Sequence, residues 1–103
     1  MIIPTVGRIV HFTPGGYDGI ARAGQPLAAI VAYVWSERMV NLTVFDSNGL
    51  PHSRTSITLL QDDDTASDGS AYCAWMPYQL GQAAKTEALS AALAASDVSP
   101  VLR

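Results

Sequence analysis

The stretch from Gln25 to Phe45, QPLAAIVAYVWSERMVNLTVF, holds two apolar runs separated by the polar residues Ser36-Glu37-Arg38. The first run, Leu27 to Trp35, is apolar at every position, which is typical of a strand buried on both faces. The second run, Met39 to Phe45, alternates apolar and polar residues as a half-buried strand does. A short polar connection suits a hairpin, so this stretch predicts the central hairpin of an antiparallel sheet.

Three further segments have the character of strands. Gly7 to Phe12 is rich in β-branched and aromatic residues, His52 to Leu60 alternates, and Ala71 to Met76 is a short run stopped by Pro77. Five short strands in a chain of 103 residues predict a mainly β domain. We expect a small antiparallel five-stranded SH3-like barrel or sandwich, and favour the barrel because closure hides strand edges.

The composition changes near the C-terminus. Residues 81–103 are rich in alanine, the best helix former, and Leu89 and Leu93 are one helical turn apart. We expect a helix over residues 83–95, bracketed by Gly81 and Pro100. Its apolar stripe is narrow and consists mostly of alanine, so it must lie on the barrel or on another chain. The predicted organisation is a barrel domain over residues 1–80 and a helical tail over residues 81–103.

Composition and charge exclude several functions. Apolar residues make up 49% of the chain and charged residues 15%, which is too apolar for disorder. This low charge suits a protein held against a partner, although a compact domain with an alanine-rich end would look the same. The net charge is −3 and the basic residues are scattered, so we expect no nucleic-acid partner. Cys73 is the only cysteine, so no internal disulfide is expected.

The chain shows no membrane-spanning or targeting signal. Its longest apolar run, Leu27 to Trp35, is far shorter than the roughly 20 residues of a membrane helix. The N-terminal residues lack the charged and apolar regions of a signal peptide. We therefore expect no membrane partner, and a product that is soluble in the cytoplasm or assembled there.

The acidic segment Asp62-Asp63-Asp64, with Asp68-Gly69 after it, resembles a calcium loop only in composition. Ala66 stands where a ligand belongs and no glutamate closes the loop. We interpret the segment as a solvated acidic loop and expect no metal site. His11 and His52 also lack the spacing of metal ligands.

Three residues could suggest a catalytic nucleophile and base of the Cys/His type. His11, His52 and Cys73 lie on separate predicted strands, and no glycine-rich elbow presents a nucleophile. Cys73 is more simply a small buried apolar residue. The segment TPGGYDGIARAG matches neither a phosphate-binding loop nor a dinucleotide fingerprint. We expect no catalytic residues and no cofactor.

Aromatic residues and the glycine-rich loop are the remaining candidates for binding. Trp35, Tyr72, Trp75 and Tyr78 could form a ligand platform, but core packing is the favoured interpretation in a small barrel. Residues 13–26, which contain several glycines and two prolines, form a long loop of the kind that often makes contacts. The predicted partner-binding residues, from this loop and from the C-terminal region, are Tyr17, Ile20, Arg22, Tyr78, Leu89 and Leu93.

Three motifs together resemble those of a known family. PTVGRIVHF stands near the start, LAAIVAYVW is followed by VNLTVF, and the last strand ends in AWMP. Over residues 4–77 the chain is similar to a family of small virion-associated β-barrel proteins of tailed bacteriophages. The pattern is GR-x-VH-[FY], then AAIV, then W-x-P, matched here by segments such as Gly7–Phe12 and Ala28–Val31. The family usually closes with Trp-x-Trp-Pro, whereas Ala74 replaces the first tryptophan here, and the helical tail is an addition.

The resemblance implies a non-enzymatic structural protein of the virion, assembled in the bacterial host cytoplasm. Within that class we expect a capsid decoration or cement protein on the exterior of the head. The expected partner is the major capsid protein or another virion protein, with further copies of the chain as an additional partner. Two alternatives remain open: a tail, neck or baseplate component, and a host-directed intracellular binding module.

Overall fold

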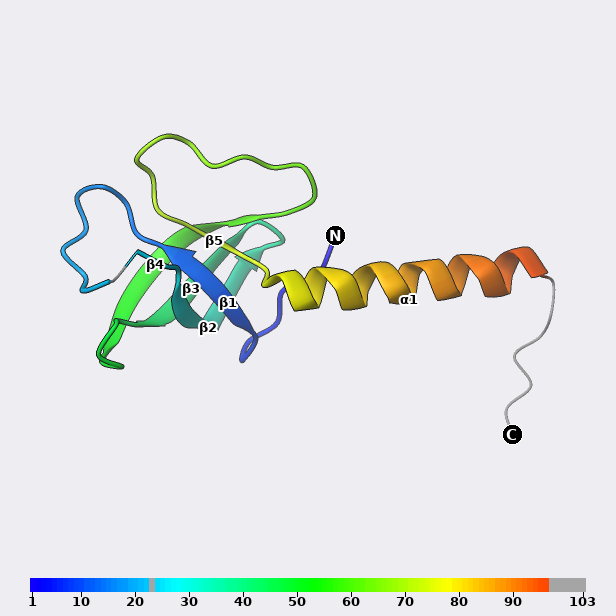
Figure 1. Cartoon of the computed structure of the whole chain (residues 1–103), viewed down its shortest axis with the longest axis horizontal. Coiled ribbons are helices and arrows are strands. Elements are labelled where there is room, and N and C mark those ends of the chain that lie inside the picture. Colours follow the sequence, from blue (N-terminus) through cyan, green and yellow to red (C-terminus); the bar gives the residue numbers. More distant parts are fainter. Residues whose placement is uncertain (23, 97–103) are drawn as a thin grey trace.

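The computed structural model describes residues 1–22 and 24–96. Its elements are β1 (Ile9–Thr13), β2 (Leu27–Ser36), β3 (Met39–Phe45), β4 (Pro51–Leu60), β5 (Tyr72–Ala74) and α1 (Pro77–Ser96). The strands close into one barrel in the order β1-β2-β3-β4-β5, and α1 extends from it (Figure 1). This confirms the predicted mainly β fold, as a barrel rather than a sandwich, with a helix at the C-terminal end.

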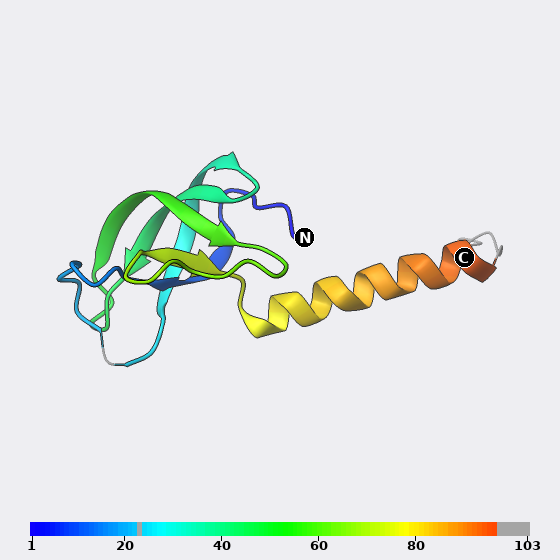
Figure 2. The same ribbon diagram turned by 90° about the horizontal axis from the view of Figure 1, so that it is seen from above.

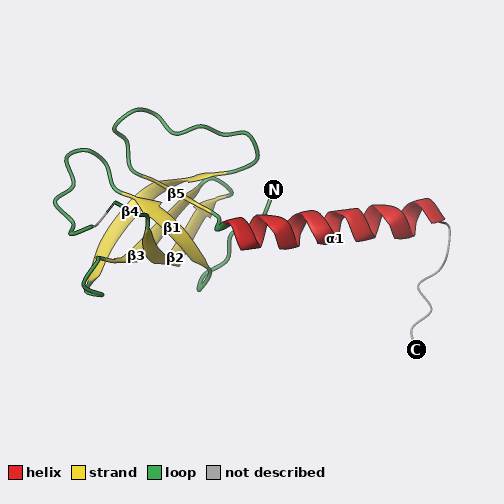
Figure 3. Cartoon of the chain, viewed as in Figure 1, coloured by secondary structure: helices red, strands yellow, loops and turns green. Residues whose placement is uncertain are grey.

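Four of the pairings in the barrel are antiparallel, as predicted, and one is parallel. β1 pairs with β2 and β5, β2 with β3, and β3 with β4, all antiparallel. β4 and β5 are parallel, with Leu59 opposite Cys73. The segment from Gln61 to Ala71 returns the chain across the barrel, because a parallel neighbour cannot be reached by a tight turn. Figure 3 shows this long connection beside the shorter turns.

One face of each strand fills the barrel. Val40, Leu42 and Val44 of β3 are buried, as their alternation predicts, while Asn41 and Thr43 are half-buried. The core joins these to residues from every other strand and from the flanking loops. Its members are Val10, Phe12, Ile20, Leu27, Ala29, Val31, Val40, Leu42, Val44, Ile57, Leu59, Cys73 and Trp75.

The expectation that β2 is buried on both faces is wrong. Leu27, Ala29 and Val31 point into the core, but Tyr33 and Trp35, which continue the same alternation, are exposed. The register of β2 against β3 shifts after Val31 and again after Val34. Such irregularities bend and twist a strand, so the second half of β2 leaves the core and its aromatic residues meet solvent.

The predicted start of α1 is also wrong, whereas its predicted end at residue 95 is within one residue of the observed end at Ser96. The helix begins at Pro77, before the expected Ala83, and Gly81 lies inside it rather than before it. Proline is well suited to the first helical position, because its missing N–H needs no partner there and its φ angle is already helical. The expected boundary at Pro100 lies outside the described residues. The observed helix therefore starts within the region that was assigned to the barrel domain.

Candidate interaction site

Helix α1 is fixed to the barrel at its first turn. The side-chain oxygen Oε1 of Gln79 accepts a hydrogen bond from the backbone N–H of Met76 at 2.7 Å. The Nε2 group of the same side chain donates to the carbonyl oxygen of Ile9 in β1 at 2.8 Å. Gln79 thus caps the start of the helix and ties it to a barrel strand, which sets the direction in which α1 leaves the domain.

Beyond this attachment, α1 projects away from the barrel. Figures 1 and 2 show the projection from two perpendicular directions, and the molecule measures 54 × 28 × 26 Å. The predicted contact residues Tyr78 and Leu89 are 73% and 62% exposed, and Leu93 is 41% exposed. Lys85 and Glu87 are the only charged residues in the helix. The helix therefore presents a mainly apolar and small-residue surface outside the domain.

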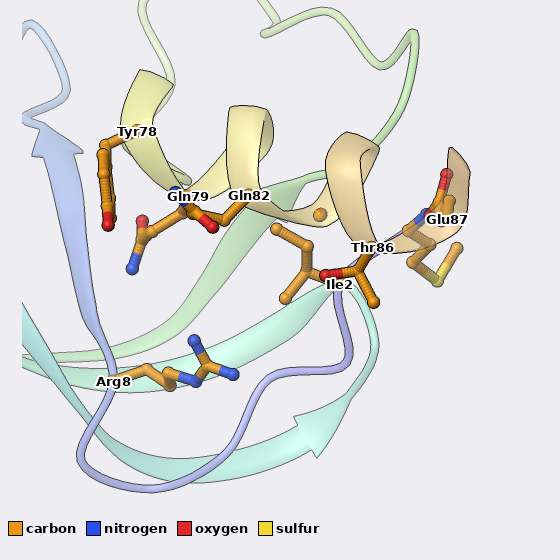
Figure 4. A pocket seen from close by; sticks show the side chains of 9 residues that line it. Ile2, Arg8, Tyr78, Gln79, Gln82, Thr86 and Glu87 are labelled. Carbon is orange, nitrogen blue, oxygen red and sulfur yellow. The ribbon is translucent and has the colours of Figure 1, made fainter. Parts of the chain in front are cut away.

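A groove lies where α1 crosses the N-terminal segment. It has a volume of about 410 Å³ and is open to solvent. Its walls are residues 1 and 2 together with Arg8, Tyr78, Gln79, Gln82, Ala83, Thr86 and Glu87, and we call it the N-terminal groove. Figure 4 shows the Arg8 guanidinium on one side of it, facing the side chains of Gln79 and Gln82 on the helix.

Arg8 is held in position by an aromatic ring. The guanidinium carbon Cζ lies 5.9 Å from the centroid of the Trp75 ring, within the range of a cation–π contact. Trp75 is 4% exposed, and its Nε1 donates to Oε1 of Gln61 at 3.1 Å. Within residues 1–22 and 24–96, Arg8 has no carboxylate at ion-pair distance. The cation is therefore oriented but not neutralised.

The glycine-rich loop between β1 and β2 is folded onto β4 and the 61–71 connection. Gly16 donates its N–H to the carbonyl oxygen of Gly69 at 3.1 Å. A Cβ atom at Gly15 would lie 2.8 Å from the Tyr17 ring and 3.1 Å from that same carbonyl oxygen, so a larger residue would displace the Tyr17 side chain and crowd the backbone of the 61–71 connection. Tyr17 itself is 85% exposed, as a contact residue should be.

The two other contact residues predicted in this loop have different environments. Ile20 is 7% exposed and belongs to the core, so the expectation that its side chain contacts a partner is wrong. The loop folds back and supplies an apolar residue that covers the end of the barrel. Arg22 is exposed and donates through Nη1 to the carbonyl oxygen of Pro14 at 3.4 Å.

An exposed aromatic pair on β2 was missed by the sequence interpretation, which favoured core positions for these residues. The rings of Tyr33 and Trp35 meet edge to face with centroids 4.8 Å apart, and they are 51% and 59% exposed. Trp35 Nε1 donates to Oδ1 of Asn41 at 2.9 Å, and the same oxygen accepts the backbone N–H of Ser56 at 2.8 Å. The signal in the sequence is Asn41, a polar residue in β3 that lies opposite Tyr33 and accepts the hydrogen bond from Trp35.

The residues of the suspected Cys/His pair are not brought together. Phe12 is opposite Cys73 and His11 is opposite Ala74, so Cys73 faces the core and His11 faces outward. His52 lies elsewhere, near the start of β4. Its Nε2 contacts Oδ2 of Asp46, in the turn between β3 and β4, at 2.8 Å. Burial raises the pKa of the Cys73 thiol to about 12, which suppresses the thiolate that nucleophilic attack requires. Cys73 is a buried apolar residue, as predicted.

The described part of the chain has neither a metal-binding cluster nor a helix suited to span a membrane. Residues 1–22 and 24–96 contain no group of three or more histidine, cysteine or acidic side chains placed to hold a metal ion. The acidic loop is exposed, but it is not only solvated: Asp64 Oδ2 accepts from Nε of Arg38 at 2.8 Å. Over the same residues, no helix combines the length and the apolar character needed to cross a membrane.

Comparison of the chain with family models, with curated proteins and with solved structures finds no significant match in any of the three. The resemblance to small phage virion proteins therefore stays a prediction that depends on the motifs themselves.

Proposed function

We propose that the chain is a non-enzymatic structural protein of a tailed-phage particle, and specifically a decoration or cement protein on the exterior of the head. The motifs of residues 4–77 suggest the family, and the helix that projects from the barrel suggests the mode of action. The barrel has its own core, and none of the core residues belongs to α1. In this role α1 packs against the major capsid protein or another virion protein.

The observation that carries the proposal is the exposure of α1. A single helix in water gains little stability from propensity alone, and most helices in proteins are stabilised by packing an apolar face. Leu89 is 62% exposed, and the described side chains around it at Lys85, Thr86 and Ala88 are exposed too. Burial of such a surface against several neighbouring chains lets the protein bind the assembled shell. Binding to the assembled state shifts the assembly equilibrium toward the shell and so stabilises it.

The test is binding to undecorated heads of a phage that carries the gene. We expect the purified protein to occupy the heads in hundreds of copies and to raise their resistance to heat. Leu89→Gln should lower the occupancy, whereas Leu50→Gln should not. Leu50 is a matched control, because it is 60% exposed and lies in the turn between β3 and β4, away from α1.

The outcomes separate the head role from its alternatives. Unchanged occupancy and unchanged heat resistance of heads after addition of the protein would reject the cement role. A copy number in the low tens or fewer per virion would indicate a tail, neck or baseplate component. Absence of the chain from washed, purified particles would indicate a binding module that acts on the host.

A further inference from the structure

We propose that the N-terminal groove is a docking site for an acidic, extended segment of a partner protein, with a glutamate or aspartate carboxylate of that segment paired to Arg8. This inference goes beyond the virion role and does not depend on which particle, if any, contains the chain. It follows from the orientation of Arg8, from the polar groups across the groove and from the rigidity of the groove's walls.

Arg8 is the charged side chain of the groove that lacks an oppositely charged partner among the described residues. Its guanidinium is fixed over the Trp75 ring and has no carboxylate partner among residues 1–22 and 24–96. A guanidinium offers parallel N–H donors that match a carboxylate, and such charge-assisted pairs are stronger than neutral hydrogen bonds. Arg8 is the one cation of the groove without a carboxylate partner among the described residues, and one such cation in a chain of net charge −3 suits a single carboxylate better than a polyanion such as nucleic acid.

The helix provides the opposite wall. Gln82 and Thr86 are one turn apart on α1, and both line the groove. Neither side chain makes a hydrogen bond to another described residue, so both can bind the backbone of an incoming segment. Ile2, half-buried beside them, provides an apolar surface for the methylene groups of the acidic side chain. These three residues explain why the occupant is a peptide and not an isolated ion.

The walls of the groove are fixed before anything binds. The side-chain amide of Gln79 accepts a hydrogen bond from the N–H of Met76 and donates one to the carbonyl oxygen of Ile9, which sets the position of α1 over β1. Glu87, the one acidic side chain in the groove, lies at the far end from Arg8 (Figure 4) and is 3.9 Å from the backbone nitrogen of Met1. A preformed site loses less conformational entropy when it binds.

The test is an NMR titration of the ¹⁵N-labelled full chain with the blocked peptide acetyl-Gly-Ala-Glu-Ala-Gly-amide. We expect saturable shifts of the Arg8 side-chain Nε–H and of the backbone amides of Gln82 and Thr86. The same peptide with glutamine in place of glutamate should bind about tenfold more weakly, as loss of a charged hydrogen-bond partner predicts. Arg8→Gln should weaken binding of the acidic peptide by a similar factor.

Lys85→Gln is the matched control, because it also removes one positive charge, from α1 near the groove, at a residue that does not line the groove. Its affinity should equal that of the unsubstituted chain, and an equal loss in Lys85→Gln and Arg8→Gln would overturn the proposal. Equal binding of the two peptides would overturn it as well, as would the absence of saturable shifts up to about 20 mM peptide. If sodium phosphate gives the same shifts at lower concentration, the groove binds small anions and the peptide assignment is wrong.

A second variant protects the test against misfolding. If Arg8→Gln loses the dispersed spectrum of the barrel, Thr86→Val on the exposed helix replaces it. Loss of the Thr86 hydroxyl should weaken the acidic peptide about threefold, in line with one neutral hydrogen bond. An unchanged affinity in Thr86→Val would then contradict the proposed contact.

Discussion

Arg54 and Asp18 form a two-pronged ion pair across 36 positions of the chain. Arg54 Nε donates to Asp18 Oδ2 at 2.8 Å, and Arg54 Nη2 donates to Asp18 Oδ1 at 2.8 Å. Asp18 Oδ1 also accepts the backbone N–H of Ile20 at 3.0 Å. The pair therefore fastens the glycine-rich loop to β4 and holds Ile20 over the end of the core. It explains how a loop of this composition adopts one conformation.

We expect Asp18→Ala to destabilise the domain by about 1–2 kcal/mol, because Arg54 and the Ile20 N–H lose charged acceptors in a partly solvated site. Urea unfolding followed by tryptophan fluorescence measures the change. Asp63→Ala is the matched control, since Asp63 is exposed in the acidic loop, and it should change stability by less than about 0.5 kcal/mol. Equal effects of the two variants would contradict the role of the pair.

The turn between β3 and β4 should make stability depend on pH through Asp46. The hydrogen bond from His52, together with the backbone N–H groups of Leu50 and Asn48, lowers the pKa of the Asp46 carboxyl from its usual 3.8. A carboxyl with a lowered pKa in the folded state stabilises the fold above its unfolded pKa. That contribution is lost as the pH falls through the folded pKa.

Asp46→Asn isolates this contribution. The difference in urea midpoint between the unsubstituted chain and Asp46→Asn should be full at pH 5 and should close as the pH falls well below 3.8. Asp63→Asn, at an exposed position, should show no such convergence. A difference that is the same at pH 5 and pH 2 would show that ionisation of Asp46 does not stabilise the turn.

Cys73 should report global unfolding. Its side chain is fully buried in β5, and burial raises the pKa of the thiol to about 12. At pH 8 the native protein should therefore not react with a thiol reagent such as DTNB over an hour, whereas the chain in guanidinium should react stoichiometrically. Rapid labelling of the native protein would mean that β5, the shortest strand, opens locally.

The sequence was sufficient for the elements that depend on local pattern. Val40, Leu42 and Val44 alternate with polar residues, and that alternation alone places one face of β3 in a core. The burial of β2 could not be predicted in the same way. Its residues are apolar throughout, and only the register shifts against β3 decide that Tyr33 and Trp35 are exposed.

The candidate site was harder to predict, because its residues are distant in the sequence. Arg8 precedes the first strand, while Gln82 and Thr86 lie on a helix whose start was misplaced by several residues. Nothing local indicates that Arg8 rests on Trp75 and faces the helix. The helix itself was expected from its alanine content, but its attachment through Gln79 depends on a contact with β1.

The environment of Gln61 could not be predicted from the local sequence either. The residue stands at the start of an acidic segment that was expected to be a solvated loop. Its side chain is 3% exposed. Nε2 donates to the carbonyl oxygens of Ile2 at 2.7 Å and Glu37 at 3.0 Å. Oε1 accepts from Nε1 of Trp75 at 3.1 Å and from the N–H of Ile2 at 3.3 Å. The side-chain amide of Gln61 thus joins the N-terminal segment, the turn between β2 and β3, and Trp75, the residue that follows β5.

We expect Gln61→Leu to be the most damaging of these substitutions, at about 2–4 kcal/mol. Leucine fills a similar volume, so the loss comes from leaving buried donors and acceptors at Trp75 and Ile2 without partners. Unfolding in urea gives the magnitude, and a shift of the tryptophan emission in the native state reports the loss at Trp75. Gln25→Leu, at an exposed position, is the matched control and should leave both readouts unchanged. If Gln61→Leu were as stable as the unsubstituted chain, water would have to reach these groups, and the barrel would not be sealed at this end.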